Sequence, residues 1–282
     1  MEVFTLLNSF AEIEPRVLAT GYLIALLFAG SAFVWRQLFK RQSHEKSFLP
    51  LNEEPRARWN SFPENFIVIL TVSLLLLGPI LWLLKTSTED QPSISLGTLV
   101  ERVLFNLSLS LIFAVVPCSK ERPWSAIGIR FNDLREQVRL GVYGFFASVI
   151  PMIVSMFMTL PFRGAENQHS LLKQLMESPD MATVSMIAVT AVIAAPIFEE
   201  LIYRVILQGW LSKIFPASVS IPLVAVLFAS AHGWRDGLAL MPLALILGYV
   251  FHRQHSYLAV VVIHALFNAT MLTLQLLSPT ST

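Results

Sequence analysis

The residues best suited to chemistry lie in the last third of the chain, inside apolar stretches. Glu199 and Glu200 are adjacent, and Arg204 follows the second glutamate by four residues. Residues four apart share a helix face, so Glu200 can pair with Arg204, with the acid on the favourable N-terminal side. Glu199 lies about 100° away around the helix. We therefore predict that Glu199 is the free carboxylate, faces the bundle interior and can act as a general base.

Two later segments repeat this one-turn spacing. Phe228 precedes His232 by four residues, and His264 precedes Asn268 by four. Each pair therefore lies on one helix face. An ionisable residue inside a membrane span costs about 2.5–3.5 kcal/mol on insertion scales, so such residues mark function by default. We expect the three helices to bring these groups to one water-holding cavity.

Each feature taken alone also has a purely structural interpretation. The glutamate–arginine pair could be a structural ion pair, and His232 could be an interfacial anchor packed against Phe228. His252 and His255 fall in the short loop before the last span, where we expect interfacial side chains. The whole set is harder to explain in this way, because a structural bundle gains little from burying so many polar groups.

The apolar stretches that hold these groups are long enough to cross a membrane. The chain has 282 residues, of which 55% are hydrophobic and 14% are charged, whereas soluble domains carry about 25% charged residues. A span needs about 20 mostly apolar residues. The predicted fold class is an all-α polytopic transmembrane helix bundle of about eight spans, at residues 17–35, 66–84, 103–117, 140–160, 183–207, 221–232, 238–251 and 258–277.

The distribution of Lys and Arg predicts on which side of the membrane each loop lies. Lys and Arg gather after the first and third spans, so we predict that these loops are cytoplasmic in a multi-pass plasma-membrane protein, with both termini on the opposite side. We expect residues 37–62 to form a flexible cytoplasmic hairpin and residues 169–177 to form an interfacial helix.

A net charge of +1, without a basic stripe, argues against a nucleic-acid partner. Cys118 is the single cysteine, which excludes an internal disulfide.

Three motifs in this order carry a family resemblance: Glu-Glu-x-x-x-Arg at 199–204, Phe-x-x-x-His at 228–232 and His-x-x-x-Asn at 264–268. Together they resemble the CPBP family, the CAAX protease and bacteriocin-processing (Abi) family of intramembrane proteases. The resemblance covers roughly residues 135–275. It divides the chain into N-terminal transmembrane helices with a cytoplasmic loop, residues 1–134, and a protease core, residues 135–282.

The resemblance implies an endopeptidase that uses glutamate-activated water and no cofactor. Its substrates would be membrane-embedded or membrane-adjacent peptides in the lipid bilayer, including the C-terminal tripeptide of prenylated CAAX proteins in eukaryotic members. Glu199 would activate the water, His232 would help to hold it, and His264 with Asn268 would stabilise the oxyanion. The remaining motif residues would support the site: Glu200, Arg204 and Phe228.

Three alternatives stay open. A zinc-dependent protease would use Glu199, His232 and His264 as ligands, although no His-Glu-x-x-His helix is present. A catalytically silent immunity or scaffold protein would keep the fold without the reaction. A proton-coupled transporter would also place Glu and His in spans, but it predicts inverted repeats, and we find no convincing repeat in the sequence.

Overall fold

The described part of the chain is helical. The structure, a computed structural model, describes residues 14–45, 47–52, 65–73, 75, 95–115, 124–162 and 180–277. These ranges contain helices and no strand, which confirms the predicted all-α class. Five of their helices are long and apolar enough to cross a membrane. Seven predicted spans coincide with described helices, and residues 66–73 and 75 of the predicted second span are also helical.

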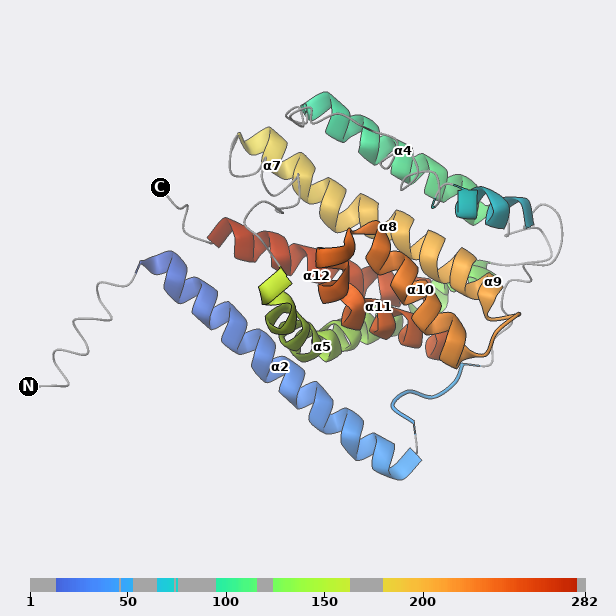
Figure 1. The fold of residues 1–282 in the computed structure, drawn as a ribbon, viewed down its shortest axis with the longest axis horizontal. Helices are drawn as coiled ribbons and strands as arrows, with labels where there is room; N and C mark the ends of the chain where they lie inside the picture. Colours follow the sequence, from blue (N-terminus) through green and yellow to red (C-terminus); the bar gives the residue numbers. More distant parts are fainter. Residues whose placement is uncertain are drawn as a thin grey trace, which may run out of the picture.

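The N-terminal helices flank the C-terminal ones. Helix α2 (Pro15–Glu45) packs on α5 (Leu134–Thr159), and α5 in turn packs on α11 (Trp234–Gln254) and α12 (Tyr257–Leu277). Helix α10 (Ala217–Ala231) packs on α11. Helix α4 (Leu96–Val115) lies at the opposite edge of the bundle from α2 (Figure 1). Short 3-10 turns, η1 (Trp124–Ile127), η2 (Phe131–Asp133) and η3 (Leu160–Phe162), adjoin α5.

The fifth predicted span is a continuous helix that twice adopts the π-helical hydrogen-bond pattern. It runs from α7 (Met181–Ala188) through the π-helix η5 (Val189–Ala194), α8 (Ala195–Glu200) and the π-helix η6 (Leu201–Gln208) to α9 (Gly209–Leu211). Asp180 caps its start by accepting the Thr183 N–H at 2.9 Å. Hydrogen bonds from the Thr183 side chain and backbone lower the pKa of Asp180 below its usual value.

The two π segments flank the short helix α8, which ends with the glutamate pair. Pro196 has no N–H to donate, so it cannot continue the regular helical ladder. The break appears just before it, where Ala195 donates its backbone N–H to Thr190, five residues earlier. A second π segment begins immediately after Glu200. Such segments occur frequently at functional sites.

The first part of the predicted flexible hairpin, residues 37–62, is ordered, so that prediction is wrong there. Helix α2 continues to Glu45. Beyond it, the Leu49 carbonyl accepts hydrogen bonds from Arg253 Nε at 2.8 Å and Nη2 at 2.6 Å, and the Asn52 N–H donates to the Arg253 carbonyl at 2.6 Å. The end of α11 leaves backbone groups without helical partners, and this segment satisfies part of them. The predicted helix at residues 169–177 lies outside the described residues.

His255 is buried rather than interfacial, which corrects the sequence prediction. It ends α11 in the left-handed conformation, with φ of 43°, and only 3% of the residue is exposed. Its Nε2 lies 3.0 Å from the Ala126 carbonyl oxygen, and Arg130 Nη1 donates to the His255 carbonyl at 3.2 Å. The turn between α11 and α12 is thus held by the segment that precedes α5. His252 is half-buried.

The close contact between α10 and α11 predicts that Gly237→Ala is destabilising. A Cβ at Gly237 would meet the backbone of Ala229, and its carbonyl oxygen would lie too close for any real Cβ contact. Forcing extra volume into packed helices costs about 1–3 kcal/mol. We expect a lower melting temperature in detergent for Gly237→Ala. The control is Gly21→Ala, where a Cβ meets nothing within 4 Å, and equal melting temperatures for both variants would contradict this packing.

Candidate active site

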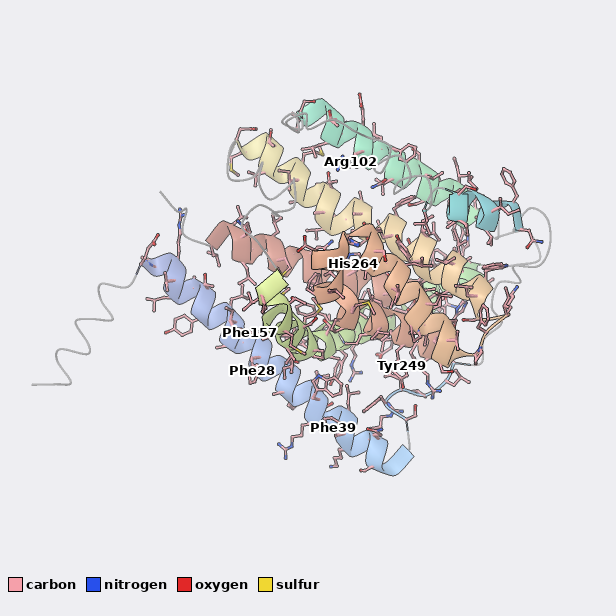
Figure 2. All side chains as sticks on the ribbon, viewed as in Figure 1. Phe28, Phe39, Arg102, Phe157, Tyr249 and His264 are labelled. Carbon is pink, nitrogen blue, oxygen red and sulfur yellow. The ribbon has the colours of Figure 1, made fainter. Side chains whose placement is uncertain are left out.

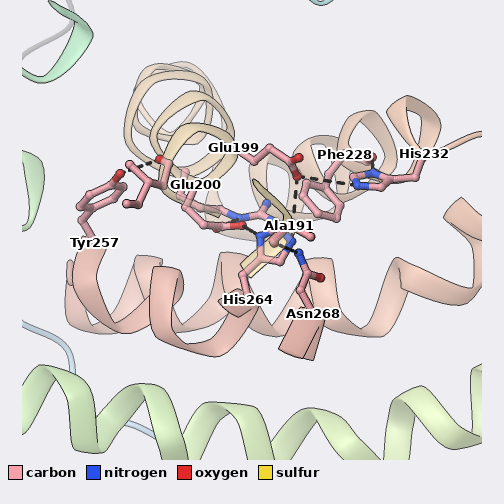
Figure 3. Close-up of polar contacts among 10 residues, drawn as sticks. Ala191, Glu199, Glu200, Phe228, His232, Tyr257, His264 and Asn268 are labelled. Carbon is pink, nitrogen blue, oxygen red and sulfur yellow. Dashed lines mark hydrogen bonds and ion pairs between the residues drawn. The ribbon is translucent and has the colours of Figure 1, made fainter. Parts of the chain in front are cut away.

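The centre of the site is the buried carboxylate of Glu200. Its Oε2 accepts a hydrogen bond from Arg204 Nε at 3.0 Å, and its Oε1 lies 2.8 Å from His264 Nδ1. The Glu200 and Arg204 side chains are both 0% exposed. The predicted Glu200–Arg204 pair is therefore confirmed. The sequence did not reveal the second contact, by which one carboxylate joins the fifth predicted span to α12 (Figure 3).

Phe228 covers this charged group from α10. The Arg204 guanidinium carbon lies 5.1 Å from the centroid of the Phe228 ring, a distance suited to a cation–π interaction. The same ring contacts His232 at a centroid distance of 4.6 Å and His264 at 5.6 Å. The predicted packing of Phe228 against His232 is confirmed. The ring also separates the two imidazoles and covers the guanidinium, whose Nη atoms make no hydrogen bond to any described residue.

Glu199 lies on another face of the helix and is 25% exposed. Its Oε2 lies 3.7 Å from His232 Nε2 and 4.0 Å from His264 Nε2. That oxygen is buried and has no hydrogen-bond partner among the residues that the structure describes. The structure thus brings together Glu199, His232 and His264, and it leaves Glu199 as the carboxylate without an arginine partner.

The hydrogen bonds of the two imidazoles define what their second nitrogens can do. His232 Nδ1 lies 2.8 Å from the Phe228 carbonyl oxygen, which can only accept a hydrogen bond. His264 Nδ1 lies 2.8 Å from Glu200 Oε1, which as a carboxylate oxygen also accepts. Both Nδ1 atoms therefore carry hydrogen, and both Nε2 atoms face Glu199. A neutral ring offers an acceptor at Nε2, and a protonated ring offers a donor.

Asn268 lies one turn after His264 but is directed partly toward the helix backbone. Its Nδ2 donates a hydrogen bond to the Ala191 carbonyl at 2.8 Å, and Ala191 belongs to the π-helix η5. One of the two amide hydrogens is therefore engaged, and no hydrogen bond joins the other to a described residue. Tyr257 makes a comparable contact that the sequence analysis missed, because its hydroxyl donates to the Ile197 carbonyl of α8 at 2.6 Å.

Glu199 and His232 line a cavity of about 510 Å³, within the range of about 300–1,000 Å³ that is typical of ligand sites. Four of its lining residues come from the N-terminal half of the chain, where the sequence predicted no site residue. The complete lining consists of Thr71, Leu75, Arg102, Asn106, Phe198, Glu199, Ile202, Tyr203, Ala231 and His232.

Arg102 was missed because the third predicted span began at residue 103. Helix α4 begins instead at Leu96, which places Glu101 and Arg102 inside it. The Ser95 hydroxyl accepts the Thr98 N–H at 3.2 Å, as a residue at the start of a helix does. This serine was the one sequence signal that could have moved the predicted start of the span.

The described residues contain no group of three or more His, Cys, Asp or Glu side chains that could hold a metal ion. Both imidazole Nε2 atoms do face Glu199. A carboxylate behind a histidine, as Glu200 stands behind His264, is also common at metal sites. The zinc alternative therefore stays a prediction for a chelator experiment.

The fold and the site together define an integral membrane protein with polar groups gathered on several of its helices. Residues 181–270 match the family model described as type II CAAX prenyl endopeptidase Rce1-like. Comparisons with curated proteins and with solved structures gave no match. The matched segment covers about a third of the chain and contains all three motifs. The resemblance to the CPBP intramembrane proteases is thereby confirmed for this segment, and the match supports a protease.

The two adjacent glutamates should differ sharply in their effect on stability. Glu200→Gln leaves the Arg204 charge buried without its counter-ion, which costs about 3–5 kcal/mol. Glu199→Gln breaks no ion pair with an arginine and affects a side chain that is 25% exposed. We expect Glu200→Gln to lower the yield and melting temperature of the purified protein and Glu199→Gln to change neither much. Equal melting temperatures for the two variants would show that the Glu200 contacts are not structurally required.

Proposed function

We propose that this protein is an intramembrane endopeptidase of the CAAX-protease type in which Glu199 activates water. The observation that carries the proposal is the environment of Glu199. It is the carboxylate of the site that pairs with no arginine, it faces the cavity, and two imidazole nitrogens lie within 4.0 Å of its Oε2. The Rce1-like match over residues 181–270 supports the same reaction class.

In this mechanism the substrate water lies between Glu199 and His232. Glu199 takes one proton from the water, and the resulting hydroxide attacks the carbonyl carbon of the peptide bond. When the tetrahedral intermediate collapses, the carbon–nitrogen bond breaks and Glu199 returns the proton to the leaving nitrogen. One water is consumed, and a carboxylic acid and an amine are formed, which leave as carboxylate and ammonium once the acid's proton has passed to the amine. Phe228 fixes the position of the His232 ring throughout.

The oxyanion would be stabilised by His264 and by the second N–H of Asn268. Because the His264 Nδ1–H donates to Glu200, its Nε2 donates to an oxyanion only in the protonated ring. A protonated His264 makes the group of Glu199, Glu200, Arg204 and His264 neutral overall. A neutral group is a sensible arrangement for a site shielded from water, where an uncompensated charge is costly.

The proposed substrates are membrane-embedded or membrane-adjacent peptides, prenylated or not, that enter the cavity from the bilayer. We place the protein in the plasma membrane with its basic loops in the cytoplasm, and we assign residues 135–282 as the protease core. A zinc-dependent form is the second candidate, because both Nε2 atoms are directed toward Glu199.

The first test is cleavage of quenched fluorescent peptides, prenylated and unprenylated, by protein in nanodiscs. Glu199→Gln should abolish cleavage without unfolding the protein, because the amide cannot take the proton from water. The same assay with a chelator tests the second candidate. If the chelator stops cleavage and added zinc restores it, Glu199, His232 and His264 are metal ligands. Full cleavage by Glu199→Gln would disprove its role as the base, and no cleavage by wild type would favour a silent scaffold protein.

Asn268→Ala tests the oxyanion contact. Removal of one oxyanion donor lowers turnover by about 10²–10³, and we expect this loss mainly in kcat. Thr273→Val is a matched control on the same helix, since the Thr273 hydroxyl is exposed and donates only to the Ala269 carbonyl. An Asn268→Ala enzyme with the kcat of the control would limit Asn268 to its contact with Ala191.

A further inference from the structure

The cavity has a second polar wall that no motif explains. Arg102 and Asn106 are four residues apart on α4, share a face, and line the same cavity as Glu199 and His232. Helix α4 packs along α7, η5 and α8, and Figure 2 shows Arg102 between the ends of α4. All of α4 lies outside the matched residues 181–270. The N-terminal half therefore contributes to a site whose proposed chemistry comes from the C-terminal half.

Arg102 is a charged and exposed side chain on α4. It lies within an apolar helix that is long enough to span a membrane. No carboxylate among the described residues forms an ion pair with it. A charged residue in a span is costly and normally faces a partner or a water-filled cavity. Since Arg102 faces the cavity, the counter-ion that it lacks can come from a bound ligand.

Two neutral groups beside Arg102 also have unused hydrogen-bonding capacity. Thr71 is 0% exposed, and its hydroxyl has no hydrogen-bond partner in the described part of the chain. Asn106 uses its backbone carbonyl to accept the Ser110 hydroxyl, while no hydrogen bond joins its side-chain amide to a described residue. A guanidinium, an amide and a hydroxyl thus face the cavity together, as a site for a carboxylate attached to a peptide would require.

We propose that Arg102 binds the C-terminal carboxylate of the substrate peptide, with Asn106 and Thr71 contacting the adjoining backbone. This inference rests on the proposed protease function and assigns to Arg102, outside the matched segment, the role of a specificity-determining residue. A guanidinium binds a carboxylate through two parallel hydrogen bonds. Glu199 is negative and repels the same carboxylate, so the two charged groups orient the peptide with its end toward Arg102. A cavity of about 510 Å³ holds only a short segment beyond the cleaved bond.

The test compares one quenched fluorescent peptide sequence in three forms in nanodiscs. The forms have a free C-terminal acid, a C-terminal amide, and an amide with an added acidic side chain. Wild type should cleave the free acid with kcat/KM about 10- to 100-fold higher than the amide, the range that one charge-assisted contact gives. Arg102→Gln should lose this preference mainly through KM and keep its activity on the amide. Arg102→Lys should retain part of the preference.

Glu101→Gln is the matched control, because Glu101 precedes Arg102 on α4 and does not line the cavity. It should keep the preference for the free acid. The wild-type comparison needs no variant, so poor folding of Arg102→Gln does not prevent a result. The inference is judged only on cleavage that Glu199→Gln abolishes. If wild type cleaves the free acid and the amide equally, or prefers the amide with the acidic side chain, the inference is wrong. Absence of any Glu199-dependent cleavage overturns the proposed function itself.

Discussion

The site depends on one buried carboxylate with two partners. Glu200 accepts hydrogen bonds from Arg204 on its own helix and from His264 on α12. These contacts satisfy both oxygens of a side chain that is fully buried. A buried ion pair contributes little net stability compared with apolar packing, but removal of one partner is very costly. Arrangements of these helices that separate Glu200 from its partners are therefore unfavourable. The His264–Glu200 contact fixes the rotation of α12 against the fifth predicted span.

The same contacts explain why the two neighbouring glutamates differ. Glu200 is fully enclosed, and Phe228 covers the guanidinium that neutralises it. Glu199 is one residue earlier, so helix geometry turns it away from that cation and toward the two Nε2 atoms. Of the two adjacent glutamates, Glu200 therefore has a structural role and Glu199 faces the cavity. The π segments on either side set the register of this short stretch.

The sequence predicted contacts within a helix better than contacts between helices. A four-residue spacing determines a shared face wherever the chain is helical, so the Glu200–Arg204 pair and the separate direction of Glu199 followed directly. The His264–Glu200 contact depends on how α12 is rotated, and no local pattern encodes that rotation. The Asn268–Ala191 contact has the same origin, since it uses a carbonyl of a π-helix.

The missed residues share a different cause. Hydropathy placed the third span after Arg102, because a charge near a span end lowers the local average. The Ser95 cap and the packing of Leu99 against Ile187 of α7 instead extend the helix to Leu96. His255 and residues 49–52 were misjudged because their burial depends on partners distant in the chain. Loop composition contains no information on such partners.

The cavity is lined by residues from inside and from outside the segment that matches a known family. Glu199 and His232 lie in the matched segment 181–270, while Thr71, Arg102 and Asn106 lie outside it. Similarity in the matched segment bears on the groups that would activate water. It carries no information on the opposite wall, whose charge and hydrogen-bonding groups determine which ligands fit beside Glu199. If Glu199 activates water and Arg102 binds the peptide end, two proteins can share the Rce1-like segment and the reaction. They can still select different peptides through the residues that α4 presents to the cavity.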